Sequence, residues 1–148
     1  MIPPFDKHGL LPPGEHLCTL EEIAERFAYN SVRKTLFEGL RSFLAQKHEP
    51  LGVQCPIYVA GSFTRRSESP EDVDIVIDFT GKDTDTFLKG LLFRLYAVQI
   101  KEEYHVDVWL KHPQIQIDLK AYFSYVGPKA GQILNLPMKH PRGVLLIK

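Results

Sequence analysis

Three aspartates in the middle of the chain have the types and spacing that suit a divalent cation. Asp72 and Asp74 begin a segment in which apolar and polar side chains alternate, and Asp107 lies in a second alternating segment, 104–110. Strand residues two apart share a face, with Cα atoms on the order of 7 Å apart, so Asp72 and Asp74 could share an ion. With a third carboxylate from a neighbouring strand, the set predicts a two-metal site for phosphoryl transfer.

A turn of small residues precedes the first two aspartates. Gly61 and Ser62 follow the apolar run 55–60. Gly61 permits a close backbone approach that a Cβ would obstruct, and Ser62 adds a hydroxyl beside amides able to hold phosphate oxygens. Arg65, preferred here to Arg66, could neutralise a triphosphate through paired hydrogen bonds. The turn therefore predicts a phosphate site beside the metal site.

Strands must position these side chains. Strict alternation over 73–79 predicts a strand with its apolar residues on the core face and Asp72, Asp74 and Asp78 on the other. Asp78 lies near the far end of that strand and is left out of the site. The segments 55–60 and 104–110 predict two more strands, and 141–148 predicts a turn leading into a short terminal strand.

Helical periodicity predicts four helices around these strands. They are a helix from the capping box Thr19–Glu22 to about residue 28, one from residue 30 or 31 to before Pro50, one from about 85 to 97–100, and one over 116–125 that Gly127–Pro128 ends. Arg33 is expected on a solvent face of the second helix. Prolines and glycines make residues 1–18 an expected extended arm.

Length and composition limit the possible classes. The 148 residues form one expected domain, 1–148, and 18 basic side chains balance 18 acidic ones, so no overall field favours nucleic acid. Cys18 and Cys55 have no metal-ligand spacing and are expected as free thiols in a cytoplasmic protein. No apolar run is long enough for a membrane span. The expected fold is α/β (α+β), a small mixed sheet with helices mainly on one face and the site on the open face.

The motifs resemble those of a known superfamily. The strings Gly61–Arg66, Asp72–Ile77 and Val106–Val108 resemble the signature of the DNA polymerase beta-like nucleotidyltransferases, especially the minimal bacterial type. The opening Ile2–Asp6 with Leu11–Gly14 and the closing Pro141–Val144 resemble an uncharacterised bacterial family of nucleotidyltransferase-like domains. One departure is Arg66, where the superfamily commonly has a small residue.

The resemblance implies roles for the site residues. Gly61 and Ser62 would hold the β and γ phosphates, Asp72 and Asp74 would bind Mg²⁺ or Mn²⁺, and Asp107 would be the third ligand that activates the acceptor hydroxyl. The implied donor is a nucleoside triphosphate, ATP first, and the implied product carries AMP. Pyrophosphate would leave.

The chain is too short to contain a separate domain that binds the acceptor. After the sheet and its helices are assigned, no residues remain for an acceptor domain, so a protein partner or an RNA is expected to supply the acceptor. Kinship with minimal members implies a helical partner or a toxin–antitoxin pair. The alternative is a catalytically silent regulator or antitoxin-like partner-binding module on the same fold. Lys139, His140 and Arg142 form a small basic cluster that is expected at the surface.

Overall fold

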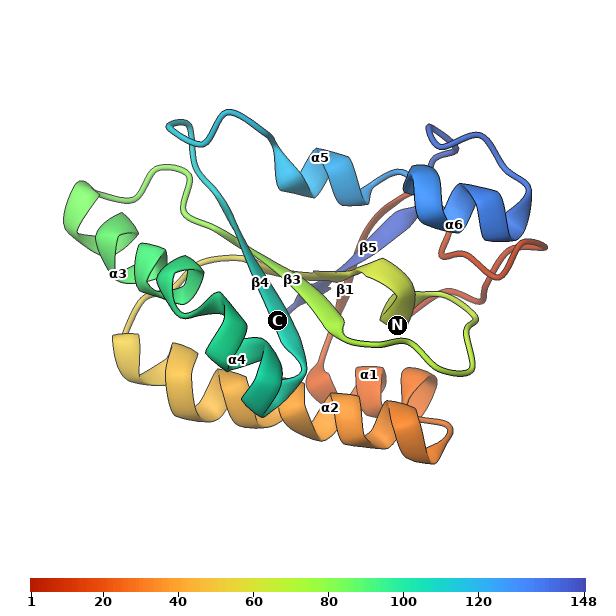
Figure 1. Ribbon diagram of the computed structural model, residues 1–148, viewed down its shortest axis with the longest axis horizontal. Helices are drawn as coiled ribbons and strands as arrows, with labels where there is room; N and C mark the ends of the chain where they lie inside the picture. The colour runs from red at the N-terminus through yellow and green to blue at the C-terminus, as the bar shows by residue number, and fades with distance from the viewer.

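A five-stranded mixed sheet forms the centre of the protein (Figure 1). The computed structural model describes residues 1–148. The strands are β1 (Gly14–Cys18), β2 (Ile57–Ala60), β3 (Val73–Asp78), β4 (Val106–Lys111) and β5 (Gly143–Ile147), in the order β1-β5-β2-β3-β4. The outer pairs β1–β5 and β3–β4 are parallel, while β2 is antiparallel to both β5 and β3. The expected α+β class with a small mixed sheet is confirmed.

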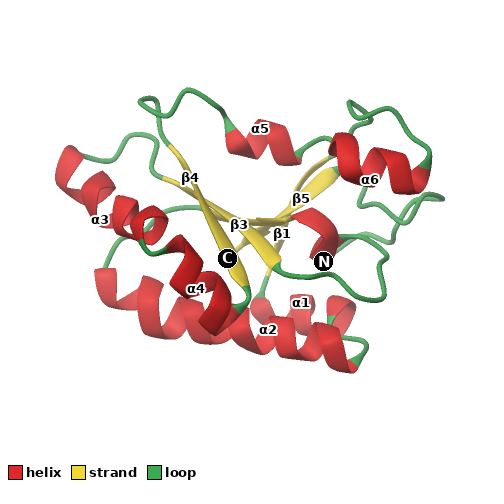
Figure 2. Ribbon diagram, in the orientation of Figure 1, coloured by secondary structure: helices red, strands yellow, loops and turns green.

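Six α-helices flank the sheet on its two sides (Figure 2). They are α1 (Leu20–Phe27), α2 (Ser31–Phe43), α3 (Thr84–Leu95), α4 (Ala97–Tyr104), α5 (Leu119–Phe123) and α6 (Gly127–Leu134). A π-helical turn (Leu44–His48) and a 3-10 turn (Glu49–Leu51) prolong α2, and a second 3-10 turn (Gly61–Thr64) follows β2. The helices α1 to α4 lie on one side of the sheet, and the short α5 and α6 lie on the other (Figure 1). None of the helices combines the length and apolar character needed to cross a bilayer.

The main core lies between the sheet and α1 to α4. Val73, Ile75 and Ile77 of β3 are fully buried in it, so the core face predicted from the alternation is correct. The capping box is also present, because Thr19 accepts from the Glu22 amide and the Glu22 side chain accepts from the Thr19 amide.

A smaller apolar cluster covers part of the opposite face. Tyr58, Ala60, Val76 and Val144 are buried there, and Trp109, Leu119, Leu146 and Phe123 pack against them. The face expected to be open is therefore partly closed by α5. The site residues lie beyond this cover, toward α6.

Three expected elements differ in the structure. The arm 1–18 ends in the strand β1, whose edge pairs with β5. The single helix expected after residue 85 breaks at Tyr96, whose backbone (φ −102°, ψ 22°) leaves the helical range, into α3 and α4. Gly127–Pro128 begins α6 and does not end a helix, because proline is compatible with the first turn, where the missing amide would have no partner.

Two aromatic residues and a glycine make the buried face of α3. Phe87, Gly90 and Phe93 face the core, whereas the leucines of the helix are at least one-third exposed, namely Leu88, Leu91, Leu92 and Leu95. Gly90 lies against the ring of Phe79, where a Cβ would clash. The two phenylalanines of α3 are therefore buried in place of its leucines.

Candidate functional site

The strands β3 and β4 bring the three aspartates together. Asp74 is directly opposite Asp107 in the parallel register, and Asp72 immediately precedes β3. Two cationic side chains lie against them: Lys101 Nζ is 3.0 Å from Asp72 Oδ2 and 3.8 Å from Asp107 Oδ2, and Arg94 Nη1 is 3.8 Å from Asp107 Oδ1. Only the carboxylates of Asp72 and Asp107 pair with a cation.

Asp74 is the most perturbed of the three carboxyl groups. Burial raises the pKa of Asp74 to about 7, and the neighbouring Asp72 carboxylate contributes to the rise. The indole Nε1 of Trp109 donates to Asp74 Oδ1 at 3.3 Å, and this hydrogen bond opposes the rise in the pKa of Asp74. Burial also raises the pKa of Asp107, which shows that the pair of strands holds charge at a cost. A cation beside these groups would lower that cost.

Gly61 closes the site from the end of β2. Its φ of +76° is in the left-handed region, and a Cβ on it would clash with Oδ2 of Asp74. The close backbone approach predicted from the sequence therefore exists, and the group approached is the Asp74 carboxylate. The turn that carries Ser62 thus lies directly against the acidic side chains.

Arg33, which was expected on a solvent face, is buried and holds the Gly61–Thr64 turn in place. Arg33 on α2 is 0% exposed and forms no salt bridge with a carboxylate. Its guanidinium donates to the carbonyl oxygens of Phe63 (2.7 Å), Arg65 (2.6 Å) and Ser67 (2.8 Å). Its helical spacing to the buried Leu36, Phe37 and Leu40 is the signal that could have placed it on the core face.

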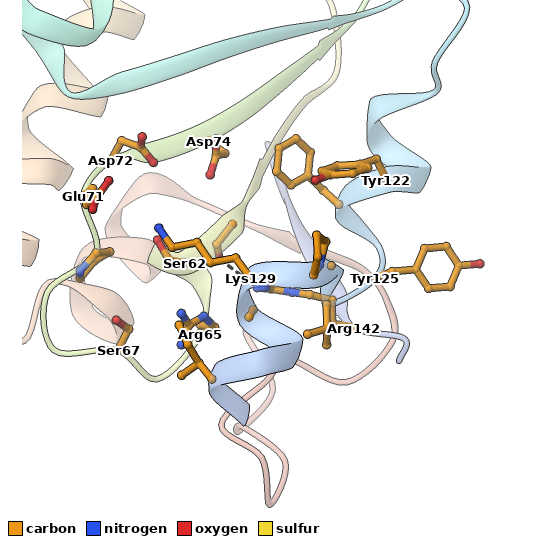
Figure 3. Close-up of a pocket in the computed structure, with 18 of the residues that line it drawn as sticks. Ser62, Arg65, Ser67, Glu71, Asp72, Asp74, Tyr122, Tyr125, Lys129 and Arg142 are labelled. Carbon is orange, nitrogen blue, oxygen red and sulfur yellow. Dashed lines mark hydrogen bonds between the residues drawn. The ribbon is translucent and has the colours of Figure 1, made fainter. Parts of the chain in front are cut away.

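A cavity of about 580 Å³ opens beside the turn (Figure 3). Five of the six predicted site residues line it, namely Gly61, Ser62, Arg65, Asp72 and Asp74. Asp107 does not, because it lies beside Asp74 against Lys101 and Arg94. We call the side with Asp72 and Asp74 the acidic wall. The opposite side, lined by Arg65, Lys129 and Arg142, is the basic wall.

Arg142, expected at the surface, is buried in the basic wall. It is 3% exposed, and its Nη2 donates to Gly61 O (3.0 Å) and Thr64 Oγ1 (2.6 Å). Burial, followed by the nearby charge of Arg65, lowers the pKa of Arg142 to about 10. No local sequence signal predicts this position, since it depends on β5 pairing with β2 and returning residue 142 to the turn.

Comparison with known proteins adds a family but no activity. A family model described as a family of unknown function (DUF6932) matches residues 3–145. The chain belongs to the DUF6932 family. No curated protein and no solved structure matches it.

Asp72, Asp74 and Asp107 of this DUF6932 chain offer carboxylate oxygens, which are chemically suitable ligands for a divalent cation. In the structure no three His, Cys, Asp or Glu side chains are grouped so as to hold an ion. The half-exposed Lys101 places its ammonium between Asp72 and Asp107 and stands where a cation would be attracted. Oxygen ligands of this kind suit Mg²⁺ and Mn²⁺. The donor set therefore fits a divalent cation in its chemistry, whereas in this structure the carboxylates are not grouped around an ion position.

Proposed function

We propose that the chain is a metal-dependent nucleotidyltransferase that moves a nucleoside monophosphate, AMP from ATP, to a hydroxyl group of a protein or RNA acceptor. One observation carries the proposal: the Gly61 turn packs on the Asp74 carboxylate at the wall of a cavity. For this chemistry a phosphate-holding turn and metal-binding carboxylates have to lie side by side, because the metal that the carboxylates would hold would activate the phosphate that the turn holds. The resemblance described above names the same residues.

The residues divide the work in the proposed reaction. Asp72, Asp74 and Asp107 would hold Mg²⁺ or Mn²⁺, which when bound supplies Lewis-acid activation and charge neutralisation at the phosphates. Ser62 and the amides of its turn bind phosphate oxygens, and Arg65 offsets their charge. The acceptor oxygen forms a bond to the α-phosphorus as the bond to the pyrophosphate oxygen breaks. The hydroxyl proton passes to a carboxylate of the trio, and pyrophosphate leaves.

The size of the cavity agrees with a nucleotide ligand. Pockets for small molecules and cofactors typically enclose roughly 300–1,000 Å³. The cavity of about 580 Å³ is within that range.

The proposed compartment is the cytoplasm. Free thiols at Cys18 and Cys55 agree with a reducing compartment.

A transfer assay tests the proposal. The protein is incubated with α-labelled ATP, Mg²⁺ or Mn²⁺, and either the protein encoded by the neighbouring gene or small RNA. We expect label on one acceptor, and Asp72→Asn and Asp74→Asn should abolish it. The matched control is Asp78→Asn on the same strand, because Asp78 is outside the cavity and contacts only the Thr80 amide. Metal-dependent ATP binding without transfer to any acceptor would refute the enzymatic proposal.

A second candidate is a catalytically silent regulator or antitoxin-like partner-binding module on this fold. The observation in its favour is Lys101, which pairs with Asp72 and Asp107 and takes the position of a cation. In such a protein the ammonium would permanently replace the metal. Metal-independent binding of a protein partner that survives Asp72→Asn, together with no Mn²⁺ binding, would favour this candidate.

A further inference from the structure

The basic wall holds two buried guanidinium groups that no carboxylate pairs with. Arg65 is 9% exposed and Arg142 is 3% exposed, and neither takes part in a salt bridge. Buried charges in proteins are normally paired, because desolvation is costly. The Asp74 charge acts on Arg142 but forms no ion pair with it. Two neighbouring guanidinium groups without an ion-pair partner therefore indicate that an anion belongs beside them.

Arg142 has hydrogen-bonding capacity left at this position. Its Nη2 is used by Gly61 O and Thr64 Oγ1, but its Nε is buried and has no partner. Buried donors without partners are rare in native structures and usually mark a missing ligand, ion or water. In Figure 3 the guanidinium groups of Arg65 and Arg142 extend toward the same part of the cavity. Arg142 thus combines a buried donor without a partner with a place in the cavity wall beside Arg65.

The N-terminus of α6 points to the same place. Pro128, Lys129 and Ala130 belong to the first turn of α6 and line the cavity. Pro128 has no amide hydrogen and the Gly127 amide donates to Met138 O, so only Lys129 and Ala130 can offer first-turn amides to a ligand. The helix dipole favours negative charge at this end. The side chain of Lys129 reaches from α6 across the cavity toward Ser62 (Figure 3). A fourth source of positive potential therefore converges on the two arginines.

We propose that Arg65, Arg142, Lys129 and the first turn of α6 form a polyphosphate-binding subsite. This inference deepens the proposed function and rests on it only for the nucleoside part of the ligand. The acidic wall attracts the metal and the basic wall takes the terminal phosphates, so the α-phosphate lies between them. Arg142 and α6 are additions to the phosphate site that the resemblance implies, and both come from the C-terminal segment 127–142.

The shared ligand chemistry is a chain of phosphates, which ATP and inorganic polyphosphate both carry. Calorimetric titration with inorganic tripolyphosphate in EDTA tests the subsite without metal and without any transfer step. We expect binding by the unaltered protein, roughly tenfold weaker binding by Lys129→Ala, and at least as large a loss for Arg65→Gln, since each removes a charge-assisted contact. Lys139→Ala is the matched control, because Lys139 is exposed in the same segment but does not line the cavity.

Further titrations distinguish ATP from inorganic polyphosphate as the ligand. An unfolding measurement shows whether a loss of binding is caused by misfolding. ATP binding more tightly than tripolyphosphate would support a nucleotide ligand, and equal affinities would support inorganic polyphosphate in the same subsite. Arg142→Lys keeps a charge near Gly61 O, and its urea unfolding is measured beside its binding. No binding at millimolar tripolyphosphate, or equal affinity of the unaltered protein, Lys129→Ala and Arg65→Gln, would overturn the subsite. A failure of AMP transfer alone would overturn only the proposed reaction.

Discussion

Lys101 provides a direct test of how the acidic wall binds a cation. Its Nζ is 3.0 Å from Asp72 Oδ2, with the lysine side chain 49% exposed and the aspartate 14% exposed. Water screens such a pair, so we take its strength as about 1–2 kcal/mol, above the typical value for a fully exposed pair. A metal ion must displace the ammonium before it can use the Asp72 carboxylate. The pair therefore opposes metal binding by about the same amount.

The variant Lys101→Met removes the charge and keeps the length of the side chain. In EDTA at pH 8 we expect it to lower the free energy of unfolding by about 1–2 kcal/mol, because three carboxylates are left near one another. Because no ammonium competes for Asp72 in this variant, we expect Mn²⁺ to bind Lys101→Met roughly 5- to 30-fold more tightly than the unaltered protein. Calorimetric titration with Mn²⁺ measures the affinity, and urea unfolding measures the stability.

Lys34→Met serves as the matched control, since Lys34 is exposed on α2 and forms no salt bridge. Its Mn²⁺ affinity should equal that of the unaltered protein. Unchanged or weaker Mn²⁺ binding by Lys101→Met would refute the reasoning, because it would show that the ammonium does not compete with the ion. Tighter Mn²⁺ binding without AMP transfer would point to the silent regulator.

Three further changes test the residues around the turn. Gly61→Ala should lower the free energy of unfolding by about 2 kcal/mol or more in urea, since the left-handed φ and the Asp74 carboxylate leave no room for a Cβ. Arg33→Met should lower it by about 3–5 kcal/mol, because several buried carbonyl groups lose their donor, and no loss in urea would contradict this. Asp74→Asn should stabilise the metal-free protein by roughly 2–4 kcal/mol at pH 8, since the pKa of Asp74 rises from 3.8 to about 7 on folding. The unfolded chain loses this proton near pH 4 and the folded one near pH 7, so stability falls across that window and Asp74→Asn should flatten the fall in urea titrations at several pH values.

The acidic wall could be predicted because its signals are local. The alternation that defines β3 contains Asp74 and begins directly after Asp72, so one pattern predicts both the strand and the face of the carboxylates. Gly61 ends a short apolar run, which is a local signal as well. That Asp107 lies directly opposite Asp74 depends on the parallel β3–β4 register, which the sequence made possible but did not specify.

Of the basic wall only Arg65 was predicted, and the burial of Arg142, like that of Arg33 behind the turn, could not be, for two physical reasons. Arginine is mostly exposed in proteins, so Arg33 and Arg142 were expected at the surface, and only tertiary hydrogen bonds to the turn offset their burial. The contact between Arg142 and Gly61 also spans most of the chain and depends on the β5–β2 pairing. Gly127–Pro128 is ambiguous in itself, since glycine and proline stand at both the ends and the beginnings of helices.

The charges of the two walls together support the proposed ligand class more strongly than either wall does alone. Burial raises the pKa of Asp74 and lowers the pKa of Arg142, so each wall holds its charge at a cost. The two walls neutralise each other only in part. The Asp74 charge acts on Arg142 and opposes the lowering of its pKa, but the ion pairs of Asp72 and Asp107 are made with Lys101 and Arg94, and none joins a carboxylate to Arg65 or Arg142. A simple anion would relieve only the basic wall, and a lone metal ion only the acidic one. A polyphosphate that carries a divalent cation relieves both, and this is the form in which ATP reacts in phosphoryl transfer.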